Sequence, residues 1–266
     1  MNDQTVLWQV EDGVGHIVLN RPDAANALDG VTVRRLADVI AQAARADVGA
    51  VLISARGRQF CAGGDIREFV AQRGELDRLV QTTLDLMHPA LHTLAELSMP
   101  VVSALQGPVG GAGIGVALCA DIVLASSAVK LRGGYSAIGL SPDLGASYYL
   151  ARRAGAARAK YLLMTNRAID AETCLRWGLV DELHAPEALA DAARALAVEL
   201  ARGATDALGG IKRLCDGAAR HDLRAHLDLE RAALVRCAVS ADAREGVAAF
   251  VEKRAPRFAG SRGTGG

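Results

Sequence analysis

A single carboxylate and a glycine-rich segment ahead of it carry the clearest chemistry in this chain. The carboxylate is Asp143, which follows Pro142. The glycine-rich segment, residues 106–121, follows a strand-like run at 101–105 and passes into a helix-like run. Backbone N–H groups in the first turn of such a helix have no partner within the helix and lie at the positive end of its dipole. The segment is therefore suited to hold an anion, or a carbonyl oxygen that gains negative charge.

A carbonyl oxygen suits this segment better than a phosphate does. The segment lacks the Gly-Lys-Ser/Thr of a phosphate-binding P-loop, and no acidic residue follows it at the distance typical of dinucleotide-binding folds. A second glycine-rich turn, residues 60–68, follows another strand-like run at 50–54. Two such turns can each supply one N–H to the same oxygen, which indicates an oxyanion hole.

These segments, in this order, resemble the enoyl-CoA hydratase/isomerase (crotonase) superfamily over nearly the whole chain. The resemblance also rests on four shorter segments, residues 20–28, 166–167, 177–180 and 244–253. It implies an α/β fold built as a spiral of repeated strand–strand–helix turns, with an acyl-CoA thioester as the substrate. It assigns the two oxyanion-hole N–H groups to Gly64 and Ala112. Ala112 replaces the glycine usual at its position but offers the same backbone group.

The resemblance further implies positions that contact coenzyme A, which enters as part of the substrate; no permanently bound cofactor and no metal are expected. The implied positions in the first third of the chain and in the two glycine-rich turns are Ala25, Ala62, Asp65, Ile66 and Gly111. We expect Asp65 to hold the loop on the adenine side rather than take part in the chemistry. Phe250 and Lys253 match positions that meet the coenzyme A of a neighbouring subunit, although an ordinary amphipathic end-helix accounts for them equally well.

The expected reaction depends on which carboxylates are present. Hydratases of this superfamily split water between two glutamates, and the matching positions here are Gly115 and Tyr135. Asp143 matches the single aspartate of 1,2-epoxyphenylacetyl-CoA isomerase-like members. The resemblance therefore favours an isomerase in which Asp143 removes and returns a proton. An apolar site should raise the pKa of this carboxyl group and make it a stronger base.

Several alternatives remain open. Asp143 also matches the nucleophile of 4-chlorobenzoyl-CoA dehalogenase-like members, in which His88 would act as the base and Tyr135 would stand where a tryptophan is usual. A structural role for Asp143 is to cap a helix at residues 145–153. A structural role for His88 is a buried place on one helical face, bonded to a backbone carbonyl. Two further functions also remain open: a hydratase with non-standard residues and a non-catalytic acyl-CoA binder.

The composition excludes several kinds of partner. The chain has 266 residues, 51% of them hydrophobic, which is enough to bury a large core. Its 30 basic and 30 acidic residues balance, so neither nucleic acid nor a membrane is expected as the main partner. The five cysteines lack metal-ligand or CxxC spacing and suit a reducing compartment. Since no signal-like or membrane-spanning run is found, we expect a cytoplasmic protein.

Alternating strand and helix patterns must position these residues. Asp29 can cap a helix, and a longer helical pattern covers residues 76–97. Strands are predicted at residues 5–10, 16–19, 50–54, 101–105 and 122–125. We expect a crotonase-like core at residues 1–185, a helical oligomerisation region at 186–260 and a disordered tail at 261–266. By resemblance, the helical region forms a homotrimer or a dimer of trimers.

Overall fold

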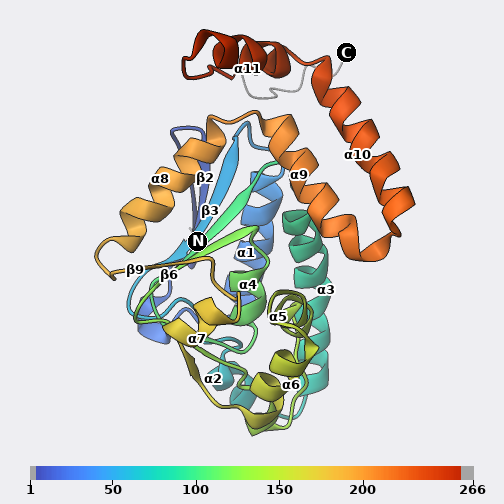
Figure 1. The fold of residues 1–266 in the computed structure, drawn as a ribbon. Coiled ribbons are helices and arrows are strands. Elements are labelled where there is room, and N and C mark those ends of the chain that lie inside the picture. The colour runs from blue at the N-terminus through green and yellow to red at the C-terminus, as the bar shows by residue number, and fades with distance from the viewer. Residues whose placement is uncertain (1–3, 259–266) are drawn as a thin grey trace.

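A six-stranded sheet forms the centre of the computed structural model, which describes residues 4–258 (Figure 1). β1 and β2 form an antiparallel hairpin around Asp12 and Gly13, which both have a positive φ, and every later pair of neighbours is parallel. The strands of this sheet, in their order across it, are β1 (Val6–Glu11), β2 (Val14–Leu19), β3 (Ala50–Ala55), β4 (Val101–Leu105), β6 (Ile122–Ser126) and β9 (Glu182–His184).

A second, three-stranded sheet follows the same path of the chain. Its order is β5 (Val109–Gly110), β7 (Lys130–Arg132) and β8 (Ile169–Asp170). Successive turns of the chain each give one strand to the large sheet and one short segment to the small one. Cys61, which follows β3, bridges Val109 of β5, and β5 pairs in parallel with β7, which follows β6. The chain therefore forms the predicted spiral of strand–strand–helix turns.

Helices cover both faces of the large sheet, which is why its inner strands are apolar on both sides. In β3, Val51 and Ile53 belong to the core shared with α1 and α3, whereas Leu52 belongs to a cluster shared with α8. Figure 1 shows the sheet between α8 on one side and α1 and α3 on the other. The α-helices are α1 (Gly30–Ala43), α2 (Ile66–Ala71), α3 (Leu76–Ala95), α4 (Gly113–Leu118), α5 (Ala146–Ala154), α6 (Ala156–Thr165), α7 (Ala171–Arg176), α8 (Leu189–Ala201), α9 (Thr205–Gly217), α10 (Leu223–Ala238) and α11 (Ala241–Glu252). Short 3-10 turns are η1 (Pro22–Ala24), η2 (Tyr135–Ile138) and η3 (Ala218–Arg220).

The element boundaries follow the sequence patterns closely. Asp29 caps α1 as predicted, because its carboxylate accepts hydrogen bonds from the backbone N–H of Thr32 at 2.8 Å and from its hydroxyl at 2.7 Å. The strand predicted at 101–105 is observed over the same residues. The strand predicted from residue 16 begins earlier, at Val14, because Val14 pairs across the hairpin with Glu11.

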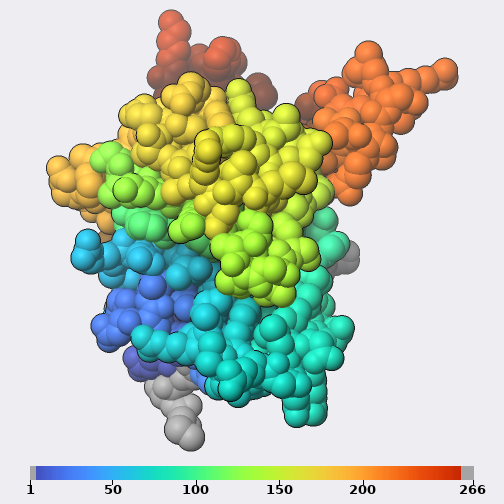
Figure 2. Space-filling view, turned by 90° about the horizontal axis from the view of Figure 1, so that it is seen from below, coloured from blue at the N-terminus to red at the C-terminus, as the bar shows by residue number. Residues whose placement is uncertain are grey.

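The last two helices extend away from the body of the protein, as Figure 1 and Figure 2 both show. α8, by contrast, packs on the large sheet. The boundary near residue 185 and the oligomerisation role stay predictions, and the tail predicted at 261–266 lies outside the described residues. No helix within residues 4–258 is long and apolar enough to cross a bilayer. Large apolar side chains that α10 and α11 leave exposed include Leu223, Leu227, Leu234, Val235, Val247 and Phe250.

Candidate active site

The two glycine-rich turns meet at the start of α4. Cys61 and Val109 form a parallel bridge, and the N–H of Gly110 donates to the carbonyl of Cys61 at 2.9 Å. A Cβ placed on Gly63 would lie 3.1 Å from the nitrogen of Ala112. Gly63 has a φ of +95°, a conformation that glycine adopts without strain. The structure thus brings together the two turns that the sequence paired.

Each turn presents one backbone N–H that has no acceptor. Within residues 4–258, neither the N–H of Gly64 nor that of Ala112 donates a hydrogen bond. The N–H of Gly111, the residue before Ala112, is already used, since it donates to the carbonyls of Gly133 at 3.1 Å and Arg132 at 3.3 Å. Two unused donors on adjacent turns can stabilise one oxygen on which negative charge develops.

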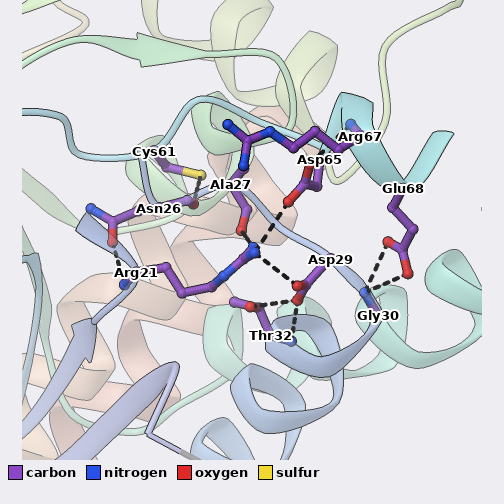
Figure 3. Close-up of polar contacts among 10 residues, drawn as sticks. All are labelled: Arg21, Asn26, Ala27, Asp29, Gly30, Thr32, Cys61, Asp65, Arg67 and Glu68. Atoms are coloured by element: carbon purple, nitrogen blue, oxygen red, sulfur yellow. Dashed lines mark hydrogen bonds and ion pairs between the residues drawn. The ribbon is translucent and has the colours of Figure 1, made fainter. Parts of the chain in front are cut away.

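A cluster of ion pairs holds the first turn in place (Figure 3). Arg21 reaches Asp29 at 2.9 Å and Asp65 at 3.2 Å, and it also donates to the carbonyl of Ala27 at 2.6 Å. The other oxygen of Asp65 accepts from the N–H of Arg67 at 3.0 Å and so caps α2. Asp65 is buried with both oxygens engaged. It therefore fixes the turn, and its place on the adenine side of coenzyme A stays a prediction.

A buried asparagine ties the same turn to the preceding segment. Asn26 is 1% exposed; its side-chain oxygen accepts from the N–H of Arg21, and its amide donates to the carbonyls of Arg56 and Gln59 at 2.9 and 2.8 Å. The thiol of Cys61 donates to the carbonyl of Asn26 at 3.1 Å, as Figure 3 shows. Burial raises the pKa of Cys61 to about 12, so the thiol stays protonated. Cys61 is thus a support beneath the turn and not a nucleophile.

Asp143 lies on the other side of α4 and is held by Tyr135. The hydroxyl of Tyr135, at the start of η2, donates to a carboxylate oxygen of Asp143 at 2.6 Å. Tyr135 is buried and Asp143 half-buried. The capping role considered for Asp143 is wrong, because α5 begins at Ala146 with Gly145 as its N-cap and no side chain caps it. The carboxylate is directed to Tyr135 instead of to the helix.

Burial dominates the electrostatics of this pair. It raises the pKa of Asp143, and the hydrogen bond from Tyr135, a backbone hydrogen bond and the charge of His88 only partly offset the rise. Burial also raises the pKa of Tyr135, and the neighbouring Asp143 charge raises it further. Tyr135 therefore stays protonated and donates, and Asp143 is a stronger base than an exposed aspartate.

His88 lies on α3. The buried structural role considered for it is wrong, because its side chain is exposed. It lines a cavity of about 750 Å³ together with Leu144 and Gly145, the two residues that follow Asp143. The cavity continues between α3, α5 and α9 and reaches a buried Lys212. The charge of His88 also lowers the pKa of Asp143, so a shared role of the two residues stays a prediction.

The other expected contact positions fall into two groups. Ala25 and Ala62 lie side by side, since the N–H of Ala62 donates to the carbonyl of Ala25 at 3.0 Å, and Ile66 opens α2 with an exposed side chain. These positions surround the first turn. Phe250 is 85% exposed, and Lys253 follows α11 as its C-cap; this helix stands apart from α4 and α5 within one chain (Figure 1).

The sequence does not reveal the residues that hold the site in place. The sequence shows Arg21 and Asn26 only as part of a segment that resembles the family, yet both anchor the turn at residues 60–68. Asn26 has a φ of +52°, a backbone conformation in which asparagine is enriched. Leu144, next to Asp143, also has a positive φ, of +44°, which is unusual for a branched side chain and was not predicted.

The two-sheet spiral and the paired donors define a crotonase-fold protein. Comparison with known proteins agrees, because a family model described as enoyl-CoA hydratase/isomerase matches residues 9–261. The chain belongs to the enoyl-CoA hydratase/isomerase family.

Its relatives include proteins named for different reactions. The chain is 38% identical to the 1,2-epoxyphenylacetyl-CoA isomerase of Escherichia coli, over 96% of this chain and 98% of that protein. It is 31% identical to the trans-2-decenoyl-[acyl-carrier-protein] isomerase of Streptococcus mutans, over 98% and 100%. The crystal structure of an enoyl-CoA hydratase from Bacillus anthracis superposes with a TM-score of 0.90 at 27% identity, covering 97% of this chain and 100% of that one. Family membership therefore supports an enzyme, with isomerase and hydratase names both present.

Removal of the Ala112 N–H tests the oxyanion hole. Ala112 has φ −55° and ψ −25°, which proline can adopt, and its N–H makes no bond in residues 4–258 that proline would break. We expect Ala112→Pro to lower kcat by roughly a hundredfold to a thousandfold, the usual loss for one donor. Steady-state kinetics on a folded variant measure this, with Ala112→Gly as the active control. Full activity in a folded Ala112→Pro variant would show that the N–H of Ala112 is not a donor of the oxyanion hole.

The raised pKa of Asp143 has a measurable effect on stability. The carboxyl group is protonated in both folded and unfolded states below about pH 4, so it has no effect there. Above about pH 4 the group ionises more readily in the unfolded state than in the folded state, so the free energy of unfolding falls as the pH rises. Above the raised pKa of the folded state, this loss of stability stays constant. Asp143→Asn removes the ionisable group. We therefore expect this variant to unfold at a higher temperature than wild type near neutral pH and at a similar temperature near pH 4.

Thermal unfolding followed by circular dichroism across this pH range measures the difference. Asp38→Asn is the control, because Asp38 is an exposed carboxylate on the outer side of α1. It should show no comparable gain at neutral pH. A lower unfolding temperature for Asp143→Asn at neutral pH would contradict the burial of a charged carboxylate at this position.

Proposed function

We propose that this protein is an acyl-CoA isomerase in which Asp143 is the single acid/base and the N–H groups of Gly64 and Ala112 bind the thioester oxygen. The observation that carries the proposal is the Tyr135–Asp143 hydrogen bond of 2.6 Å. This bond holds a carboxylate of raised pKa in a turn that packs against α4, the helix that begins beside the unused donor of Ala112. Gly115 and Tyr135 contribute no further carboxylate to this site.

The reaction then consists of two proton transfers. The Asp143 carboxylate takes a proton from the carbon beside the thioester, or from its vinylogous position, and the electron pair of the broken C–H bond moves into a thioester enolate. The hydrogen bonds from Gly64 and Ala112 stabilise the enolate oxygen. Asp143, now protonated, returns the proton to another carbon of the acyl group, so the double bond moves and nothing is oxidised or lost. Coenzyme A takes part only as a piece of the substrate.

A dehalogenase-like mechanism is the second candidate, and the position of His88 favours it. His88 is exposed, its charge lowers the pKa of Asp143, and it lines a cavity together with Leu144 and Gly145, which follow Asp143. In that mechanism the Asp143 oxygen attacks the acyl group and expels a leaving group, and a water activated by His88 then hydrolyses the aspartyl ester. A hydratase, which adds water to the double bond, and a binder that turns nothing over are the remaining candidates.

Proton exchange distinguishes these mechanisms. Incubated with an enoyl-CoA in deuterated water, the wild-type protein should place deuterium on acyl carbon. We expect Asp143→Asn to bind the same acyl-CoA but to lose this exchange by at least about a hundredfold, since the amide is not a base. His88→Ala should lose much less. NMR or mass spectrometry of the recovered thioester makes the measurement.

Other outcomes point to the other candidates. A covalent Asp143 ester that accumulates in His88→Ala, or ¹⁸O from labelled water in the Asp143 carboxylate, would replace the isomerase with the dehalogenase-like mechanism. A product heavier by one water would identify a hydratase. Binding without exchange or product would leave a non-catalytic binder.

The proposal includes a homotrimer or a dimer of trimers in the cytoplasm. The exposed apolar side chains of α10 and α11 need a partner surface, and the cysteines within residues 4–258 are all free thiols, as a reducing compartment permits. We also propose that Phe250 and Lys253 reach the coenzyme A of a neighbouring subunit, because α11 does not approach the site of its own chain.

Sedimentation tests the assembly. We expect a species well above the 27.7 kDa mass of one chain at micromolar concentration, and weaker association for Leu234→Arg, which places a charge on the exposed face of α10. Lys253→Ala should weaken acyl-CoA binding and leave the assembly intact. A single monomeric species in the wild type would overturn the proposed assembly.

A further inference from the structure

Two glycines inside α4 need an explanation, because glycine within a helix is less stable than alanine. Gly113 and Gly115 both have ordinary helical backbone angles, since neither has a positive φ. Conformational freedom is therefore not the reason for either glycine. The remaining reason is the space that a side chain would fill.

Each glycine lies against the backbone of a different turn of the site. A Cβ on Gly113 would lie 2.7 Å from the carbonyl oxygen of Cys61, in the turn that carries Gly64. A Cβ on Gly115 would overlap the carbonyl oxygen of Leu144 and lie 2.8 Å from its carbonyl carbon. Residues two apart in a helix point in different directions. The short helix α4 is therefore packed between the two turns, with one glycine facing each.

The contact at Gly115 is the tighter one, and its partner cannot swing aside. The clashing atoms belong to the main chain of Leu144, which follows Asp143 directly and is buried. Leu144 and Gly145 have φ values of +44° and +78°, so the turn is already in a conformation that few residues adopt. On its far side, a Cβ on Gly145 would lie 2.9 Å from the ring of Tyr149. The turn is thus confined on both sides.

We propose that Gly115 is a positioning residue for Asp143: the missing side chain at position 115 is the space into which the Asp143 turn fits, and it sets the place of the carboxylate. The inference rests on the proposed function of Asp143 as the base. A methyl group at position 115 would displace the carbonyl of Leu144 and carry Asp143 away from Tyr135. A displacement of about 1 Å at a reacting group can lower a rate by about a hundredfold.

The contact between Gly115 and the carbonyl of Leu144 also limits which side chains positions 115 and 143 can carry at the same time. A carboxylate introduced at position 115 would occupy the volume of the Leu144 carbonyl and expel the turn that carries Asp143. Residues 115 and 143 therefore cannot both supply a carboxylate in this backbone. The packing of α4 restricts the site to one acid/base group and so bears on the class of reaction.

Gly115→Ala tests the proposal, with Gly210→Ala as a matched control. Gly210 is also a helical glycine, in α9, but a Cβ there would meet nothing within 4 Å. We expect Gly115→Ala to lower kcat for deuterium exchange by about a hundredfold with KM changed by less than about threefold. The double variant Gly115→Ala/Asp143→Asn should lose no more than Asp143→Asn alone, because both changes remove the same function. Gly210→Ala should keep wild-type kinetics.

A crystal structure of Gly115→Ala gives a readout that does not depend on activity. We expect the Tyr135–Asp143 contact, 2.6 Å in the wild type, to be broken. An intact contact with unchanged kcat would overturn the positioning role, whatever the reaction is. If Asp143→Asn keeps full exchange while Gly115→Ala still breaks the contact, the proposed function fails and the positioning of Asp143 by Gly115 stands.

Gly145→Ala covers the case in which Gly115→Ala does not fold. It strains the same turn at the next residue, because alanine is disfavoured at the φ of +78° that Gly145 adopts, and its Cβ would lie 2.9 Å from the ring of Tyr149. We expect the same selective loss of kcat. Wild-type kinetics in a folded Gly145→Ala would contradict the claim that this turn must be confined to place Asp143.

Discussion

The close approach of two backbone turns to α4 is the constraint on which the site depends. Gly113 admits the carbonyl of Cys61 on one side of the helix, and Gly115 admits the carbonyl of Leu144 on another. Both turns are therefore placed against the same six-residue helix, one with a free N–H and the other with a carboxylate. Main-chain contacts of this kind define positions more sharply than side-chain packing does, because neither partner can rotate away. The spiral of the two sheets matters to function because it delivers these segments to one place.

In the proposed reaction, the strength of the base depends on a balance between burial and one hydrogen bond. Burial raises the pKa of Asp143, and the hydrogen bond that Tyr135 donates lowers it again in part. A carboxylate left fully unpaired in such a place would take up a proton and lose its use as a base. The same burial makes the ionised form costly for the fold. Base strength and fold stability are thus opposed at this residue, as is common where an enzyme tunes a catalytic pKa.

Local patterns in the sequence predicted the elements that depend on local physics. The Asp29 cap, the strand at 101–105 and the two glycine-rich turns follow from residue types within a few positions of each other, and the resemblance to a known superfamily supplied Asp143. The contacts that join distant segments were not predictable in this way. Arg21 reaches Asp65 across 44 positions, and Gly115 meets Leu144 only because the spiral brings them together. The capping role of Asp143 and the buried role of His88 were wrong for the same reason, since periodicity does not reveal which groups lie opposite a side chain.

A crystal structure with an acyl-CoA enolate analogue tests the central claim most directly. The account predicts that the analogue's oxygen lies about 3 Å from the nitrogens of both Gly64 and Ala112. It also predicts a carboxylate oxygen of Asp143 within about 3.5 Å of the carbon that exchanges its proton. An analogue whose oxygen is bound elsewhere, or an Asp143 turned away from the acyl group, would contradict the account.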